Sequence, residues 1–137
     1  MKTFSIPVKA PSAQEEFYGR DGNIKYAGMH LLAELWNAKY LQDAAKIRSI
    51  LIKAIDACGA TMLGINLHTF SPNGGVSGVA VLKESHISIH TWPELDYAAI
   101  DIFVCGRIDP RSAVDILKAE FQPKSIEIIE IKRGIIL

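Results

Sequence analysis

Reactive side chains gather in the middle of this chain, in the segment GGVSGVAVLKESHISIHTWPELDYAAIDIFVCG, residues 74–106. Serine and cysteine can act as nucleophiles or proton donors, and histidine is a base near neutral pH. On a strand, in which alternate side chains face opposite sides, His86, Ser88 and His90 would share one surface. A half-solvated sheet also alternates polar and apolar residues without any chemical reason. The segment therefore allows acid–base or nucleophilic chemistry, but its pattern alone does not require it.

The elements that position this segment are mostly strands. The stretch 29–37 fits either a helix or a strand, and its alternation favours a strand. The four central strands are separated by short segments rich in turn-forming residues: SPNGG, KES and PELD. The expected strands are 29–37, 61–70, 76–83, 86–92, 97–105 and 125–132.

Two helices complete the expected fold. Apolar residues recur at helical spacing from about residue 41 to Cys58, and Gly59 supplies the stop. A second helix is expected over 109–121, with Asp109 as N-cap and Pro110 in its first turn. Short turns between consecutive strands indicate an antiparallel sheet. We therefore expect an α+β fold, a two-layer sandwich with both helices on one face of the sheet.

The other face of such a sheet needs a cover. A two-layer domain leaves that face to solvent or to another copy of itself, and oligomers of one chain are usually symmetric. The sequence therefore predicts a homodimer.

Composition limits the class of partner. The chain has 137 residues with 15 basic and 15 acidic side chains, and no run of Lys or Arg exceeds two. This balance argues against a nucleic-acid partner and favours a small molecule. No apolar span predicts a membrane segment, and Cys58 and Cys105 are expected as free thiols in a reducing cytoplasm. The four histidines lack companions at metal-ligand spacing, so no metal is expected.

The motif ESHISIHTWPE followed by YAAIDIFVCG resembles the signature of the prokaryotic S-adenosylmethionine decarboxylases, which are self-processing pyruvoyl enzymes of spermidine synthesis. The resemblance continues upstream through GVSGV and Gly59 to HLLAEL, so it covers nearly everything after Gly28. We accordingly expect residues 1–27 to form an N-terminal extension and residues 28–137 to form the single decarboxylase domain.

The resemblance implies a cut between Glu84 and Ser85 that leaves a β chain, 1–84, and an α chain, 85–137. The Ser85 hydroxyl attacks the Glu84 carbonyl to form an ester, and elimination then converts Ser85 into the pyruvoyl cofactor. That group forms a Schiff base with the substrate. By the same resemblance, His90 is the base for elimination, Ser77 hydrogen-bonds the processing intermediate, and Cys105 is the proton donor in decarboxylation.

Three further residues are implied to bind S-adenosylmethionine. Phe70 and Trp92 resemble the aromatic pair that encloses adenine, and Glu94 resembles the acid that holds the ribose hydroxyls. Two features depart from the family pattern. The loop FSPNGG is one residue longer before GVSGV, and Leu95 and Asp96 replace an aromatic residue and a glycine.

Other functions remain open at this point. The same pyruvoyl chemistry could act on arginine or ornithine, with the processing residues retained and the adenosine pocket changed. A non-catalytic regulatory homologue would be expected to lose the cleavable serine, and a plain α+β binding module would explain the fold but not the motif.

The spacing of Ser85 and His90 imposes a geometric constraint. The two residues are five apart, an odd number, so on one regular strand they would face opposite sides of the sheet. The sequence therefore predicts an irregular or strained backbone at the junction of Glu84 and Ser85.

Overall fold

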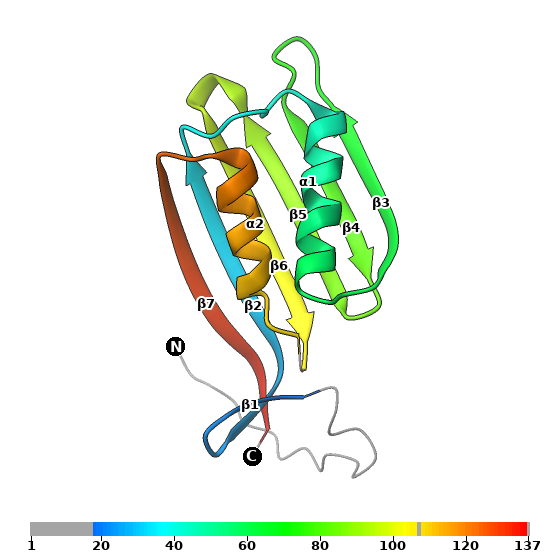
Figure 1. The fold of residues 1–137 in the computed structure, drawn as a ribbon, viewed down its shortest axis with the longest axis vertical. Helices are drawn as coiled ribbons and strands as arrows, with labels where there is room; N and C mark the ends of the chain where they lie inside the picture. The colour runs from blue at the N-terminus through cyan, green and yellow to red at the C-terminus, as the bar shows by residue number, and fades with distance from the viewer. Residues whose placement is uncertain (1–17, 107, 137) are drawn as a thin grey trace.

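The computed structural model describes residues 18–106 and 108–136, which form one antiparallel sheet with two helices on one side of it (Figure 1). Most of the extension expected over 1–27 lies outside these residues. Its final part contributes to the sheet, however, because β1 pairs with the beginning of β2. The elements in chain order are β1 (Gly19–Asp21), β2 (Ile24–Trp36), α1 (Ala44–Ala57), β3 (Met62–Thr69), β4 (Val76–Leu82), β5 (Ser85–Trp92), β6 (Tyr97–Cys105), α2 (Arg111–Phe121) and β7 (Ser125–Ile136).

The sheet has seven strands, one more than expected, because β1 was not anticipated. Its path is β1-β2-β6-β5-β4-β3, and β7 pairs with β2 on the edge opposite β6. Every pairing is antiparallel. The long strand β2 therefore sits between β6 and β7, and the reactive segment occupies β4, β5 and β6 side by side.

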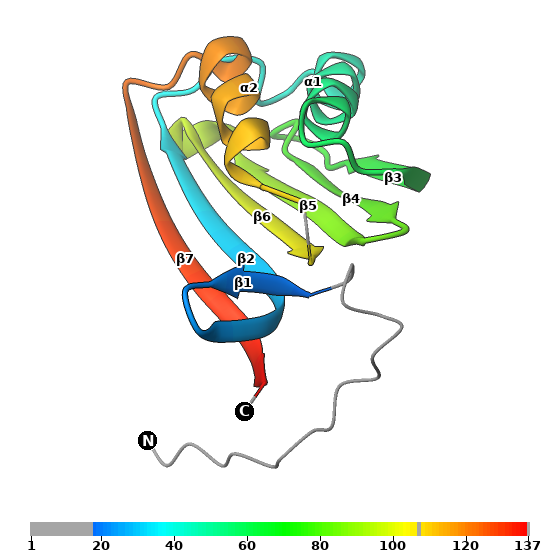
Figure 2. The ribbon, with the colours of Figure 1, turned by 60° about the horizontal axis from the view of Figure 1, so that its bottom comes forward.

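Both helices cover the same face of the sheet, as Figure 2 shows, which confirms the expected two-layer α+β fold. Their buried residues, together with alternate residues of the strands, make the core. On β5, Ile87 and Ile89 have no exposed surface, whereas His90 between two buried neighbours is exposed. This alternation places the polar side chains of β5 on the face away from the helices.

The ambiguous stretch 29–37 is a strand, and β2 is longer than expected because it begins at Ile24. Helix α1 begins after Asp43, whose carboxylate accepts a hydrogen bond from the Lys46 amide. The expected N-cap of α2 was wrong by one residue. Pro110 holds that position without a side-chain bond, and Asp109 instead accepts from the Arg111 amide at 3.0 Å.

The face away from the helices is uncovered in this single chain and carries large apolar side chains. Ile129 is 54% exposed and Val81 is 47% exposed, and Ile131 lies opposite His30 on the same surface. Among residues 18–106 and 108–136, no helix is long and apolar enough to cross a membrane.

The helix layer should be the main source of stability. Leu51 on α1 is fully buried, so Leu51→Ala should lower the free energy of unfolding by about 2–5 kcal/mol through lost burial and a residual cavity. Urea unfolding measures this change. The exposed neighbour Arg48 is the control, since Arg48→Ala should change stability by less than about 0.5 kcal/mol. Equal losses in both variants would contradict the packing described here.

Candidate active site

The junction between β4 and β5 is a tight turn formed by Lys83 and Glu84, with Leu82 and Ser85 paired across it. Ser85 has a φ of 141°, a value that favours glycine and that L side chains rarely adopt. Such a conformation costs on the order of 1–3 kcal/mol and persists only where its surroundings hold it. The predicted irregular junction at Glu84 and Ser85 is confirmed.

Backbone groups from two neighbouring strands hold this turn. The amide of Cys105, at the end of β6, donates to the Glu84 carbonyl oxygen at 2.9 Å. The amide of Thr61, just before β3, donates to the Glu84 carboxylate at 2.6 Å, and its carbonyl accepts from the Lys83 amide at 2.9 Å. Thr61 was not anticipated from the sequence because it acts through its backbone, which leaves no signal in residue type.

The Cys105 thiol is half-buried beside this turn. Burial raises its pKa above the usual value, and the nearby Glu84 carboxylate raises it further. The thiol therefore stays protonated near neutral pH, the form that a proton donor needs. Cys58, the other free cysteine, is packed against the core and donates to the Ile55 carbonyl, as expected for a structural residue.

A second group of predicted residues meets at the opposite end of β4 and β5. Ser77 and His90 are paired across the two strands, and their side chains approach to 2.8 Å between Oγ and Nδ1. A hollow of about 220 Å³ lies beside them. Its walls include all the predicted substrate-binding residues; the lining residues are Phe70, Asn73, Gly75, Ser77, His90, Thr91, Trp92 and Glu94.

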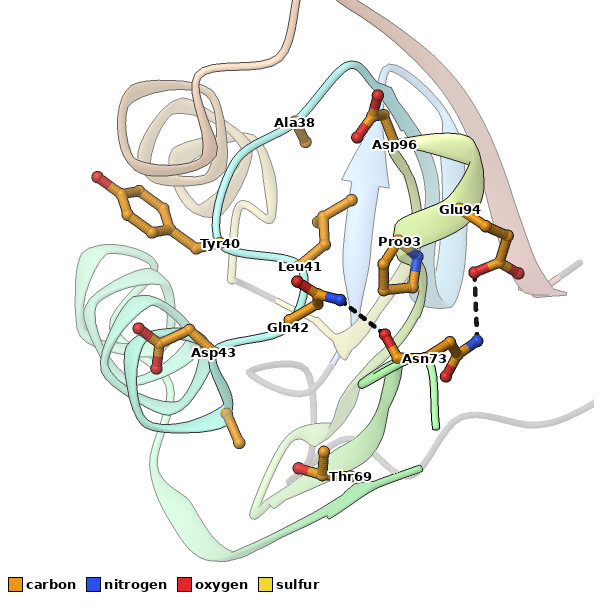
Figure 3. Close-up of a pocket in the computed structure, with 11 residues that line it drawn as sticks. Ala38, Tyr40, Leu41, Gln42, Asp43, Thr69, Asn73, Pro93, Glu94 and Asp96 are labelled. Atoms are coloured by element: carbon orange, nitrogen blue, oxygen red, sulfur yellow. Dashed lines mark hydrogen bonds between the residues drawn. The ribbon is translucent and has the colours of Figure 1, made fainter. Parts of the chain in front are cut away.

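The Glu94 carboxylate is oriented by a short chain of hydrogen bonds, shown in Figure 3. The Asn73 side chain donates to Glu94 at 3.2 Å, and Gln42 donates to the Asn73 carbonyl at 2.7 Å. A larger open hollow of about 850 Å³ shares Glu94 and Asn73 with the first, and its other lining residues include those of the loop before α1. Gln42 and Asn73 were missed by sequence reasoning, because their role depends on loops that meet only in the folded chain.

The structure does not bring the two groups together within one chain. Ser85 begins β5 and pairs with Val104, whereas His90 pairs with Ala99 further along the same strands. Five residues of strand span roughly 16 Å. Glu84, Ser85 and Cys105 thus form one cluster, which we call the cleavage cluster. Ser77, His90, Phe70, Trp92 and Glu94 form another, which we call the pocket cluster. Within 18–106 and 108–136, no group of three or more His, Cys, Asp or Glu side chains is placed to hold a metal ion.

The influence of Glu84 on the thiol can be measured directly. Glu84→Gln removes the negative charge, so the pKa of Cys105 should fall toward its usual value of 9.0. The measurement is the pH dependence of iodoacetamide alkylation, which reports the thiolate, in a Cys58→Ser, Ser85→Ala chain with one cysteine. The same chain with Glu84 retained is the control. An unchanged midpoint would show that the carboxylate does not act on Cys105.

Comparison with known proteins places this geometry in a family. The model of the S-adenosylmethionine decarboxylase family matches residues 29–134. An S-adenosylmethionine decarboxylase proenzyme from Methanococcus maripaludis is 47% identical over 116 residues, which cover 82% of this chain and 94% of the relative. One from Moorella thermoacetica is 45% identical over 112 residues, covering 80% and 89% respectively.

A solved structure agrees with these relatives. The crystal structure of the adenosylmethionine decarboxylase from Aquifex aeolicus superposes with a TM-score of 0.71 at 34% identity, covering 80% of this chain and 92% of that one. The resemblance seen in the motif ESHISIHTWPE thus extends over residues 29–134, which include both helices and most of the sheet. The chain belongs to the S-adenosylmethionine decarboxylase family.

Proposed function

We propose that this chain cleaves itself between Glu84 and Ser85 and uses the resulting pyruvoyl group to decarboxylate S-adenosylmethionine. Family membership supplies the reaction class, since the relatives are decarboxylase proenzymes. The observation that carries the proposal in this chain is the turn itself. Ser85 is held at a φ of 141° while the carbonyl it would attack is fixed by the Cys105 amide.

Cleavage begins with the Ser85 hydroxyl. Its oxygen adds to the Glu84 carbonyl carbon, and charge develops on the oxygen that already accepts from the Cys105 amide, so this donor is in place before the reaction. The C–N bond then breaks and the amide becomes an ester. A base removes the Ser85 α-proton, the Glu84 carboxylate leaves, and addition of water with loss of ammonia completes the group. The strained φ of Ser85 favours this path because the strain is released when the peptide bond breaks.

The residues around Ser85 fit a pyruvoyl group. Ser85 and Cys105 are half-buried at the sheet end, and the cleaved chain would begin at residue 85, next to the thiol. The pyruvoyl carbonyl supplies an electron sink for the electrons released when carbon dioxide leaves. Cys105 then donates its proton to the former α-carbon of the substrate, which its raised pKa permits at neutral pH.

Substrate recognition falls to the pocket cluster. The rings of Phe70 and Trp92 border one hollow and offer apolar faces to adenine, while the Asn73-held carboxylate of Glu94 is an acceptor for ribose hydroxyls. We also propose that the enzyme works in the cytoplasm, where the free thiols of Cys58 and Cys105 stay reduced.

A complete site needs both clusters, and two copies of the chain can supply it. The apolar face away from the helices gives each copy a surface to bury. Stacking two such faces about a two-fold axis with strands reversed would set the cleavage cluster of one copy over the pocket cluster of the other. His90 and Ser77 would then act on the partner's Ser85, which resolves the separation of roughly 16 Å within one chain.

The proposed activity is tested by intact mass and by release of labelled carbon dioxide. Purified wild type should give two chains, 1–84 and 85–137, and should release label from carboxyl-labelled S-adenosylmethionine. Ser85→Ala should remain one chain and release none. Release of label from arginine or ornithine instead would show that the substrate is that amino acid. An uncut wild type that releases no label would contradict the proposal and favour a regulatory homologue.

The two-copy site makes a separate prediction. Ser85→Ala and His90→Ala chains should each stay uncut alone. Mixed in one dimer, the intact Ser85 of one chain meets the intact His90 of the other, so the His90→Ala chain should be cleaved. Coexpression with distinguishable tags and mass analysis measures this, and co-purification of the tags confirms mixing. Failure of the mixed dimer to cleave would place Ser85 and His90 in a single chain.

A further inference from the structure

Three aromatic rings form a ladder across the sheet end that carries the pocket cluster. Trp36, Tyr97 and Trp92 lie directly opposite one another on β2, β6 and β5. The Trp36 and Tyr97 rings stack with centroids 4.4 Å apart, and the Tyr97 and Trp92 rings stack at 5.2 Å. Their planes differ by only 25° and 27°. Tyr97 is therefore held between two indole rings, both of which are partly exposed.

The middle ring of the ladder is fixed at its tip. The Tyr97 hydroxyl donates to the carboxylate of Glu34, which lies two residues before Trp36 on β2. Burial and this hydrogen bond raise the pKa of Tyr97 to about 12, so the phenol keeps its proton and remains a donor. Stacking on both faces and a bond at the tip leave Tyr97 little rotational freedom.

Trp92 is the rung of the ladder that also belongs to the pocket cluster. It lines the 220 Å³ hollow with Phe70 and Glu94, whereas Trp36 and Tyr97 do not. Trp92 is 39% exposed, and its ring contacts are with Tyr97 and, with centroids 6.4 Å apart, with His90. Without Tyr97 behind it, the indole could turn away from the hollow.

We infer that Tyr97, anchored by Glu34, is a positioning residue for substrate recognition, because it holds Trp92 against the hollow in the orientation that receives a flat heterocycle. This inference rests on the proposed function, in which that heterocycle is adenine. Tyr97 does not contact the hollow and acts only through Trp92. A merely structural ladder would stabilise the fold through its stacked rings but would leave the affinity for the substrate unchanged.

The binding probe is 5′-methylthioadenosine, which carries the adenosine part of the substrate without its amino acid. Its Kd, measured by calorimetry on cleaved enzyme, should rise at least 10-fold in Tyr97→Leu. Tyr97→Phe keeps the stacking, so its Kd should stay within about 3-fold of the wild-type Kd. Glu34→Ala frees the phenol, and its Kd should lie between those of Tyr97→Phe and Tyr97→Leu. For S-adenosylmethionine, Tyr97→Leu should raise KM by a similar factor with kcat changed less than about 3-fold.

A second readout does not depend on activity. The chain has two tryptophans, so Trp36→Phe leaves Trp92 as the only one. In that background, Tyr97→Leu should lower the fluorescence anisotropy of Trp92 and shift its emission to the red, because the indole gains mobility and water. Tyr18→Leu, at the other end of the molecule, is the matched control and should change neither the anisotropy nor the Kd.

The outcomes separate the two proposals. Unchanged Kd and anisotropy in Tyr97→Leu, with wild type active, would overturn the role of the ladder alone. Equal losses in kcat and kcat/KM would also overturn it, since they would indicate an effect on the chemical step. If Tyr97→Leu does not fold, Glu34→Ala tests the same role, and an unchanged Kd for 5′-methylthioadenosine in that variant would overturn it. A wild type that neither binds the probe nor releases label would overturn the proposed function, and the ladder's role with it.

Discussion

The hydrogen bond from the Cys105 amide to the Glu84 carbonyl joins the end of β6 to the turn between β4 and β5. Because Cys105 pairs with Gly28 of β2 on its other side, the turn is tied through β6 to the long strand β2. Thr61, just before β3, holds the same turn from the other side. Two segments that are distant in sequence thus fix this turn, and Ser85 is kept at a φ of 141°.

The same antiparallel register explains where the remaining groups lie. Alternation on β5 buries Ile87 and Ile89 under the helices and leaves His86, Ser88 and His90 on the open face. The length of the strands then sets the two clusters apart along the sheet, with the cleavage cluster at one end and the pocket cluster at the other. The register that fixes each cluster therefore also sets the distance between them, since Ser85 pairs with Val104 and His90 pairs with Ala99 on the same two strands.

Much of this arrangement was predictable from residue patterns. Period-two alternation identified the polar face of β5, and the odd spacing of Ser85 and His90 predicted an irregular junction, which the backbone has. Patterns could not reveal Thr61, which acts through its amide, or Gln42 and Asn73, whose loops meet only after folding. They also missed β1, a three-residue strand too short to show alternation. The family resemblance, and not the spacing, supplied the expected roles of Ser77, Cys105 and Glu94, because a residue's role in a reaction leaves no periodic signal in the sequence.

The open face carries a polar group that is difficult to explain in a single chain. The Nε2 atom of His30 is buried without a hydrogen-bond partner among the described residues, and the Asp101 carboxylate lies 3.9 Å away, beyond bonding distance. Burial lowers the pKa of His30, so the ring is driven toward its neutral form, which keeps one nitrogen as an acceptor. An unsatisfied buried polar atom costs about 1–3 kcal/mol, a penalty that a donor, acceptor or ordered water trapped at an interface would remove. The open face thus combines exposed apolar side chains with one buried polar atom that lacks a partner, and the proposed dimer would give both a contact.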